Sequence, residues 1–433
     1  MVRERGERGN LVRGTAGSFA LLVSKTVLQL GVAILLARIL EPSGFGAYAF
    51  AMSIVTLLGL VVVFGLPGLL TREVAAGEAR ESWGAVRGLT RRADQLVLLS
   101  LVVALPAGLA AVGLWPGISQ SFRLTFAFAL VFMAFTAFAK VRAAELQGLR
   151  HVLIGQVGLM GIQPGAILLG VAVAEFVVGW HLTPVRAFAI TAAAALLSFV
   201  FNAGWVRRFR PEALVRAKPE YHTRDWVRSA LPFAVLSGLY LVNSQADIVM
   251  LGFMAKSSDV GLYKVAATGA TLVAMVLTAL NPVIGPTLAR QYALQDHVRL
   301  KRTARTGALL TTLCAAPIVL LYFFAGKPLL SLVFGHAYIA AWLPLVILSI
   351  GQFVNASVGS VGLLLNMTGH ERDTLWVLAG TALMNIVLNA ALIPYFGMTG
   401  AAVSTAVSMA AWNSTMTLRV KRRLGFFLTP FFK

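Results

Sequence analysis

The chain has 433 residues, of which 58% are hydrophobic and only 12% charged, and its formal net charge is +20. A soluble domain carries about 25% charged residues, so this composition excludes an ordinary soluble protein and predicts a surface that mostly meets lipid. Lys and Arg are concentrated in short segments between apolar runs, which indicates cytoplasmic loops of a membrane protein and not a nucleic-acid-binding face.

Twelve apolar runs are long enough, at about 20 residues each, to cross the ~30 Å hydrocarbon core as helices. The first is longer than the roughly 7–15 residues of a signal-peptide core, so it is interpreted as a retained span. In chain order the expected spans are residues 16–40, 45–66, 95–114, 124–139, 152–178, 187–206, 231–254, 260–280, 306–324, 341–365, 375–393 and 401–417.

The distribution of basic residues predicts how these spans are threaded. With a cytoplasmic N-terminus, 30 of the 37 Lys and Arg fall in cytoplasmic segments, six fall outside, and Lys25 lies within the first span. This split predicts that both termini are cytoplasmic. The longest cytoplasmic connection, residues 207–228, carries seven basic residues and is expected to link an N-terminal lobe (1–206) to a C-terminal lobe (229–433).

An internal repeat relates the two halves. An offset of 215 positions aligns Phe45-Gly46-Ala47-Tyr48 with Val260-Gly261-Leu262-Tyr263, and without a gap it aligns Pro67 with Pro282. Because six helices are an even number, both lobes begin on the same side and face the same way. Parallel repeats of this kind are typical of secondary transporters, with substrate at the repeat interface. We therefore expect an all-α membrane protein with two six-helix lobes around a central cavity.

One polar face lies in the first span. Lys25 is near mid-depth, where a charge costs several kcal/mol, and Ser18 and Gln29 share its helical face. This face is predicted to line the cavity. The alternative is that Lys25 reaches the interface or pairs within its own lobe.

The seventh span has a second polar stripe. Ser237, Tyr240, Ser244 and Asp247 are spaced i, i+3, i+7 and i+10, and Asn243 lies beside them. Asp247 is a candidate coupling site for a proton or cation, or a partner of Lys25 or Lys264. The alternative is a structural hydrogen bond that caps a helix break.

Two further cations complete the candidate cavity. Arg38 ends the first span and Lys264 lies in the outer part of the eighth; cationic side chains suit an anionic headgroup, although Arg38 could simply reach the outer interface. The predicted cavity residues are Lys25, Gln29, Arg38, Tyr240, Asn243, Ser244 and Lys264. Asn385 and Asn389 are expected to hold helices together.

The sequence excludes several other sites. Its only cysteine, Cys314, lies in an apolar run, and the six histidines form no ligand pair at helical spacing. A phosphate loop ending in Lys-Ser or Lys-Thr and a nucleophile elbow are both missing. We expect no metal site, no cofactor and no catalytic residues.

Several motifs resemble those of the polysaccharide transporter family, which contains oligosaccharide flippases of the multidrug/oligosaccharidyl-lipid/polysaccharide exporter superfamily. The resemblance extends from about residue 17 to the end of the last span. It rests on Leu36–Pro42, Phe45–Tyr48, Gly65-Leu66, Thr71-Arg72-Glu73, Pro232, Asp247–Gly252, Val260–Tyr263, Gly369, Asn385 with Asn389, Ile393-Pro394 and Gly397–Ala402.

The resemblance implies a flippase that moves an undecaprenyl-pyrophosphate-linked oligosaccharide across the bacterial inner membrane by alternating access, for lipopolysaccharide or exopolysaccharide synthesis. It implies membrane lipids and lipid-linked oligosaccharide as partners, polymerases or glycosyltransferases as further partners, no nucleic acid, and function as a monomer. One alternative is a multidrug or small-molecule antiporter of the same superfamily. Another is a membrane glycosyltransferase or polymerase of the same pathway.

Overall fold

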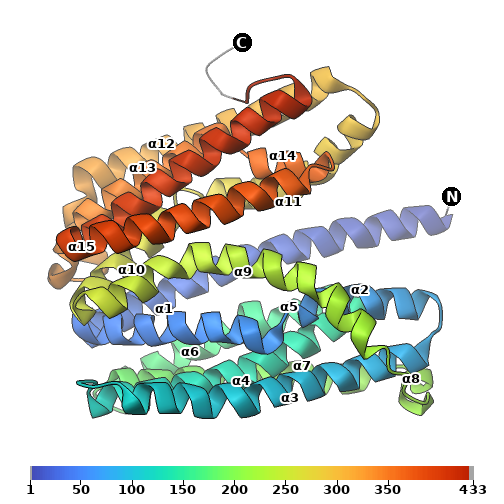
Figure 1. Cartoon of the computed structure of the whole chain (residues 1–433), viewed down its shortest axis with the longest axis horizontal. Coiled ribbons are helices and arrows are strands. Elements are labelled where there is room, and N and C mark those ends of the chain that lie inside the picture. Colours follow the sequence, from blue (N-terminus) through green and yellow to red (C-terminus); the bar gives the residue numbers. More distant parts are fainter. Residues whose placement is uncertain (1, 429–433) are drawn as a thin grey trace. The chain divides into compact units, whose positions relative to one another are not determined.

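The computed structural model describes the backbone of residues 2–428 and the side chains of residues 17–428. All regular structure in this range is helical, as predicted (Figure 1). The basic residues before the first span and residues 429–433 lie outside the described side chains. The cytoplasmic position of both termini therefore stays a prediction.

The helices follow the chain in this order. The first half contains α1 (Val2–Val63), α2 (Leu66–Ala79), α3 (Trp83–Leu114), α4 (Gln120–Gly148), α5 (Val152–Val157), the π-helix η1 (Gly158–Ile162), α6 (Gln163–Ala172), the π-helix η2 (Val173–Val177), α7 (Pro184–Phe209) and α8 (Glu212–Arg216). The second half contains α9 (Thr223–Met254), α10 (Ser257–Thr271), α11 (Met275–Ala293), α12 (His297–Val333), the 3-10 helix η3 (His336–Ala341), α13 (Trp342–Val358), α14 (Val361–Met367) and α15 (Glu371–Leu424).

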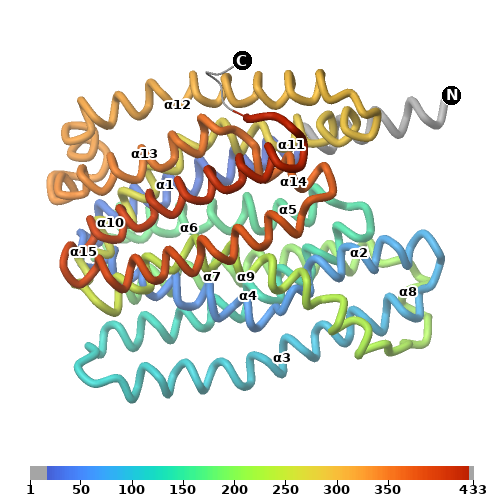
Figure 2. The backbone as a smooth tube through the Cα atoms, turned by 45° about the horizontal axis from the view of Figure 1, so that its top comes forward, coloured from blue at the N-terminus to red at the C-terminus, as the bar shows by residue number. Residues whose placement is uncertain are grey.

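Two of the long helices each contain a reversal of the chain. Glu41 in α1 has φ 56° and ψ 172°, and Gly397 in α15 has φ 53° and ψ −131°. The chain turns back in both helices (Figures 1 and 2). Among residues 17–428, nine helices are long and apolar enough to span a membrane, or ten if α10 and α11, bent by 45°, form one span. The number of twelve spans stays a prediction.

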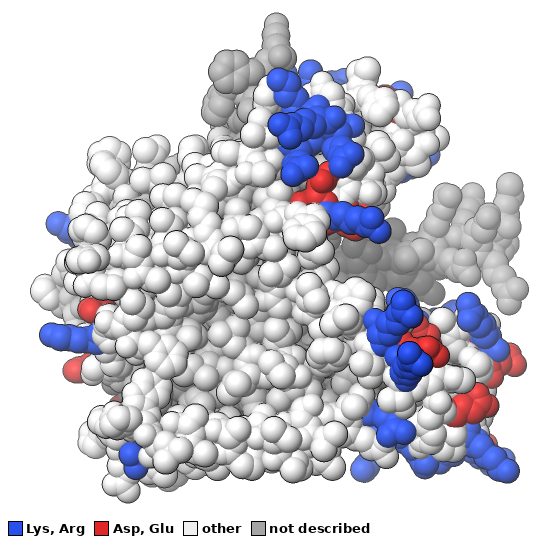
Figure 3. All heavy atoms as spheres, viewed as in Figure 1, with Lys and Arg blue, Asp and Glu red and all other residues white. Residues whose placement is uncertain are grey.

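The surface has the character of a multi-pass membrane protein. Leu98, Leu99, Val102 and Val103 of α3 are 57–65% exposed, which is favourable only against lipid. Lys and Arg gather over the ends of helices, while the broad middle of the visible face carries few charges (Figure 3).

The chain forms two compact units. Unit 1 contains Met1–Leu40 and Ala51–Gly238, and unit 2 contains Glu41–Phe50 and Leu239–Lys433. The boundary between these compact units lies within α9, and the two six-helix lobes with a linker at residues 207–228 stay a prediction. That segment packs on α3, where Arg87 Nη1 donates to the Ala217 carbonyl at 2.6 Å and the Glu220 amide donates to the Gly84 carbonyl at 3.0 Å. The predicted linker is therefore held by unit 1.

Candidate functional site

Asp247 of α9 is the centre of a buried polar cluster in unit 2. Asp247 is only 5% exposed. Its Oδ2 accepts hydrogen bonds from the Tyr263 hydroxyl of α10 at 2.8 Å and from Thr405 Oγ1 of α15 at 2.5 Å. Two neutral donors from different helices thus converge on one carboxylate oxygen.

Two asparagines of α15 complete the cluster. Asn389 Nδ2 donates to Asp247 Oδ1 at 2.7 Å and to Asn385 Oδ1 at 3.0 Å. Both asparagines are buried, and Asn389 Oδ1 has no hydrogen-bond partner among the described residues. An amide carbonyl oxygen of this cluster therefore remains available to accept a further hydrogen bond or to ligate a cation.

The reversal at Gly397 explains how α15 supplies both sides of the cluster. Asn385 and Asn389, four residues apart, share one helix face before the reversal, and Thr405 follows it. A Cβ at Gly400 would lie 2.5 Å from the Leu392 carbonyl oxygen, so only glycine allows the two arms to approach this closely. The two arms then place an amide and a hydroxyl against Asp247.

This arrangement is suited to holding a small cation or a proton. A carboxylate inside a membrane is costly unless donors or a cation compensate it. Within unit 2, the described hydrogen-bond partners of Asp247 are a tyrosine, a threonine and an asparagine. Among the described residues, no group of three or more His, Cys, Asp or Glu could hold a metal ion. One carboxylate with neutral oxygen ligands matches a proton or a monovalent cation better than a transition metal.

The stripe predicted on the seventh span is divided in the structure. Tyr240 is 45% exposed and Ser244 is also exposed, whereas Asp247 is buried. Asn243 Nδ2 donates to the Leu378 carbonyl of α15 at 3.5 Å. Within unit 2 the hydrogen-bond partners of Asp247 are neutral. A pairing with Lys25 of unit 1 or with Lys264 stays a prediction.

The remaining predicted cavity residues fall in different units. Lys25, Gln29 and Arg38 are on the part of α1 in unit 1, with Gln29 and Arg38 exposed and Lys25 partly buried; Lys264, also partly buried, is in unit 2. Lys140 of α4 is near enough to Lys25 for their ammonium groups to repel each other. Unit 1 thus brings two cations together, while a cavity shared with unit 2 stays a prediction.

The sequence interpretation missed most of the partners of Asp247. Tyr263 and Thr405 were not singled out as site residues, and Asn385 and Asn389 were assigned to helix packing. The available signal was the spacing of two amides four residues apart in an apolar run, because buried polar groups need partners. Nothing in the sequence indicates that this face meets Asp247.

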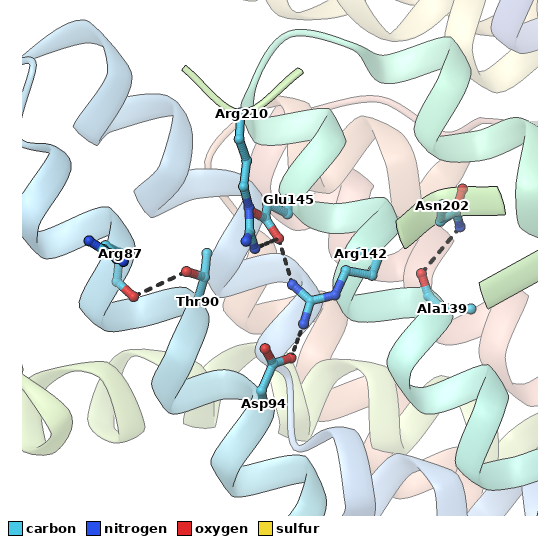
Figure 4. A network of polar contacts seen from close by, with 8 residues as sticks. All are labelled: Arg87, Thr90, Asp94, Ala139, Arg142, Glu145, Asn202 and Arg210. Atoms are coloured by element: carbon cyan, nitrogen blue, oxygen red, sulfur yellow. Dashed lines mark hydrogen bonds and ion pairs between the residues drawn. The ribbon is translucent and has the colours of Figure 1, made fainter. Parts of the chain in front are cut away.

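A second polar cluster lies in unit 1 (Figure 4). Glu145 of α4 is fully buried, and both of its oxygens accept from Arg210, at 2.7 and 3.0 Å. Arg142 donates to Glu145 at 2.8 Å and also pairs with Asp94 of α3. Two carboxylates and two guanidinium groups compensate one another, so this cluster joins α3, α4 and the end of α7. Its charges leave no unpaired carboxylate for a ligand.

Comparison with known proteins gives one family and two curated relatives. The family described as polysaccharide biosynthesis protein matches residues 11–291. The probable flippase AglR of Haloferax volcanii is 28% identical over 169 residues, or 38% of this chain, and the probable low-salt glycan biosynthesis flippase Agl15 of the same organism is 25% identical over 170 residues, or 39%. The match covers only 35% of the length of each relative.

Solved structures extend the similarity over nearly the whole chain. The lipid II flippase MurJ in an inward closed conformation gives a TM-score of 0.74 at 12% identity, covering 95% of this chain and 87% of that one. An inward-facing multidrug resistance transporter of the MATE family gives 0.72 at 14% identity, covering 93% and 94%. At these identities the likeness shows the fold alone: a helical transporter fold, as the sequence resemblance implied.

Proposed function

Because the chain belongs to the family of polysaccharide biosynthesis proteins, we propose that it is a flippase that moves a lipid-linked oligosaccharide across a membrane. The two curated relatives, which are named as flippases, support the activity. The helical transporter fold supports a carrier and not an enzyme. Two lobes that alternate between inward-open and outward-open states would move the sugar headgroup while its lipid tail stays in the bilayer.

The observation that carries the mechanism is the buried cluster around Asp247. A carboxylate with two hydroxyl donors and an amide donor can exchange those donors for a proton or a monovalent cation, and Asn389 Oδ1 is available as a further ligand. The ion would change hydrogen bonds between α9, α10 and both arms of α15. Ion binding would then favour one conformation by the difference in its affinity for the two.

The cargo we propose has an anionic pyrophosphate at its centre. Lys25, with Lys140 beside it, provides positive charge in unit 1, and Lys264 provides it in unit 2. Arg38 extends this charge at the end of the first span, and Gln29, Tyr240, Asn243 and Ser244 are suited to sugar hydroxyls. In a bacterium the cargo would be an undecaprenyl-pyrophosphate-linked precursor of lipopolysaccharide or exopolysaccharide in the inner membrane. Both curated relatives are archaeal, so the test also includes an oligosaccharide on a second polyprenyl carrier.

The test is a flipping assay with the full chain in proteoliposomes. Oligosaccharide linked to undecaprenyl pyrophosphate, or to dolichyl phosphate, is added, and its protection from a membrane-impermeant oxidant is followed under a proton or sodium gradient. We expect flipping by the wild type and a loss of gradient dependence in Asp247→Asn. Asp225→Asn, on the exposed first turn of the same helix, is the matched control. Normal gradient-driven flipping by Asp247→Asn would remove Asp247 from coupling.

A multidrug antiporter is the second candidate, because the fold is shared with a MATE transporter. A cationic drug favours an acidic binding surface, whereas Lys25 and Lys140 are basic. The test adds a cationic dye to the same proteoliposomes. If the dye is transported and neither lipid-linked oligosaccharide is flipped, the antiporter proposal replaces the flippase proposal.

A further inference from the structure

A slot in unit 1 lies between α3, the start of α9 and the junction of α1 with α2. Its volume is about 200 Å³. On α3 it follows one helix face from Leu89 through Arg92 and Leu96 to Ser100. This distance of eleven residues corresponds to a length of about 16 Å. The slot is therefore elongated along the helices.

The lining of the slot is apolar apart from Arg92, Thr223 and Ser100. Trp226 and Ala230 of α9, Leu66 of α2 and Ala93 of α3 form buried walls, and Val61 of α1 lies 67% exposed at the edge. The only charged residue that lines it is Arg92. An apolar slot in lipid gains nothing from water, so a hydrocarbon chain is the occupant that fits its walls.

Arg92 has unused hydrogen-bonding capacity at the charged end. Its guanidinium lies over the Tyr221 ring at 4.9 Å from the centroid, and its Nε is buried without a hydrogen-bond partner among the described residues. Among residues 17–428, whose side chains the structure describes, no carboxylate forms an ion pair with Arg92. Asp94, two positions along, is already paired with Arg142. A guanidinium offers several donors in one plane, the geometry that a phosphate accepts.

The depth of Arg92 matches a lipid headgroup. The exposed apolar stripe of α3 begins at Leu98 and Leu99, six residues after Arg92, or about 9 Å along the helix. Arg92 follows the basic residues Arg87 and Arg91, which precede the stripe. The cation is thus at the basic end, and the slot extends from it toward the apolar middle.

We propose that this slot binds one anionic phospholipid of the leaflet at the basic end, with its phosphate on Arg92 and one chain along α3. The bound lipid would fill the space between α3 and the first turns of α9, and so stabilise the packing of residues 217–220 on α3. The site is separate from the Asp247 cluster, and the proposal does not depend on the cargo of the transporter.

Tryptophan quenching tests the site directly. The full chain is placed in nanodiscs of phosphatidylcholine that contain increasing fractions of lipid brominated on its acyl chains, either phosphatidylglycerol or phosphatidylcholine. The chain has eight tryptophans, so the signal of Trp226 is taken as the difference between the wild type and Trp226→Phe. We expect brominated phosphatidylglycerol to quench Trp226 at a fraction about tenfold lower than brominated phosphatidylcholine, as one charge-assisted contact predicts.

Matched variants separate the site from general attraction to basic loops. Arg92→Gln should abolish the preference for phosphatidylglycerol, whereas Arg91→Gln, an exposed neighbour with the same change of charge, should retain it. Ala230→Leu, which fills the slot, should reduce quenching by both lipids. If Arg92→Gln does not fold, Arg92→Lys takes its place; it keeps the charge but lacks the planar guanidinium, and should reduce the preference for phosphatidylglycerol without abolishing it. Equal effects of Arg91→Gln and Arg92→Gln, equal quenching by both lipids in the wild type, or an unquenched Trp226 would overturn the proposal.

Discussion

Gly46 and Gly261 occupy the same position in the two sequence repeats and pack directly against each other within unit 2. A Cβ at Gly46 would lie 1.7 Å from the Ser257 carbonyl oxygen and 2.9 Å from the Gly261 nitrogen. A Cβ at Gly261 would lie 2.1 Å from the Pro42 carbonyl oxygen and 3.1 Å from the Gly46 nitrogen. Pro42 and Ser257 are themselves related by the offset of 215. The contact is therefore reciprocal, as expected where two copies of one motif meet about a local two-fold axis.

This contact predicts that alanine is not tolerated at either glycine. Gly46→Ala or Gly261→Ala should each lower the stability of the detergent-solubilised protein by more than about 2 kcal/mol, because backbone atoms must move apart. Thermal unfolding followed by size-exclusion chromatography measures the effect. Gly380→Ala in α15, where a Cβ would meet nothing within 4 Å, is the control. The double variant should lose less stability than the two single variants lose together, because both changes disrupt the same contact.

Removing one donor from Asp247 should destabilise unit 2. Tyr263→Phe deletes the hydroxyl that donates to Oδ2 at 2.8 Å, at a cost of about 1–3 kcal/mol for a buried charged acceptor. Thermal unfolding measures the loss, and Tyr395→Phe, at a residue that is 82% exposed, is the control. Equal stability of the two variants would show that this hydrogen bond contributes little.

The ion-pair cluster of unit 1 should be sensitive to loss of its central carboxylate. Glu145→Gln leaves Arg142 and Arg210 without a shared anion, and breaking a buried pair typically costs about 3–5 kcal/mol. Glu212→Gln removes an exposed pair with Arg216 and should change stability by less than about 1 kcal/mol. Chemical unfolding in detergent compares the two. A small effect of Glu145→Gln would mean that water replaces the lost partner.

If the proposed cargo is correct, positive charge at position 25 should govern its binding. Lys25→Gln should raise the half-saturating concentration of lipid-linked oligosaccharide about tenfold, the effect of one charge-assisted contact. Lys25→Arg should restore much of the affinity, and Lys218→Gln in the segment on α3 should leave it unchanged. The flipping assay provides the measurement. Wild-type affinity in Lys25→Gln would exclude this side chain from cargo binding.

Residues 217–220 should pack less tightly on α3 when Gly88 is given a side chain. A Cβ there would lie 1.6 Å from the Glu220 carbonyl oxygen. Gly88→Ala should therefore weaken the bond from the Glu220 amide to Gly84 and accelerate its hydrogen exchange about tenfold. Mass spectrometry of the peptide around residue 220 detects this change. Gly113→Ala, also on α3 and with nothing within 4 Å of its Cβ, should not affect it.

The membrane character, the helical class and the repeat could be predicted from the sequence alone. Apolar runs and basic loops report a preference for lipid or water that each segment carries by itself. The breaks expected between the spans at residues 41–44 and 394–400 contain the reversals at Glu41 and Gly397. The family resemblance depended on the same local motifs. Asp247 was identified because a charge in an apolar run needs a compensating partner.

Only the tertiary structure decided which partners meet. Asn389 and Thr405 are 142 and 158 residues from Asp247 in sequence, and no periodicity within one helix specifies which face of another it contacts. The same reason separates Asp247 from the Tyr240 and Ser244 stripe and places residues 217–220 on α3. Helix formation depends on neighbours along the chain, whereas these contacts depend on how distant helices pack.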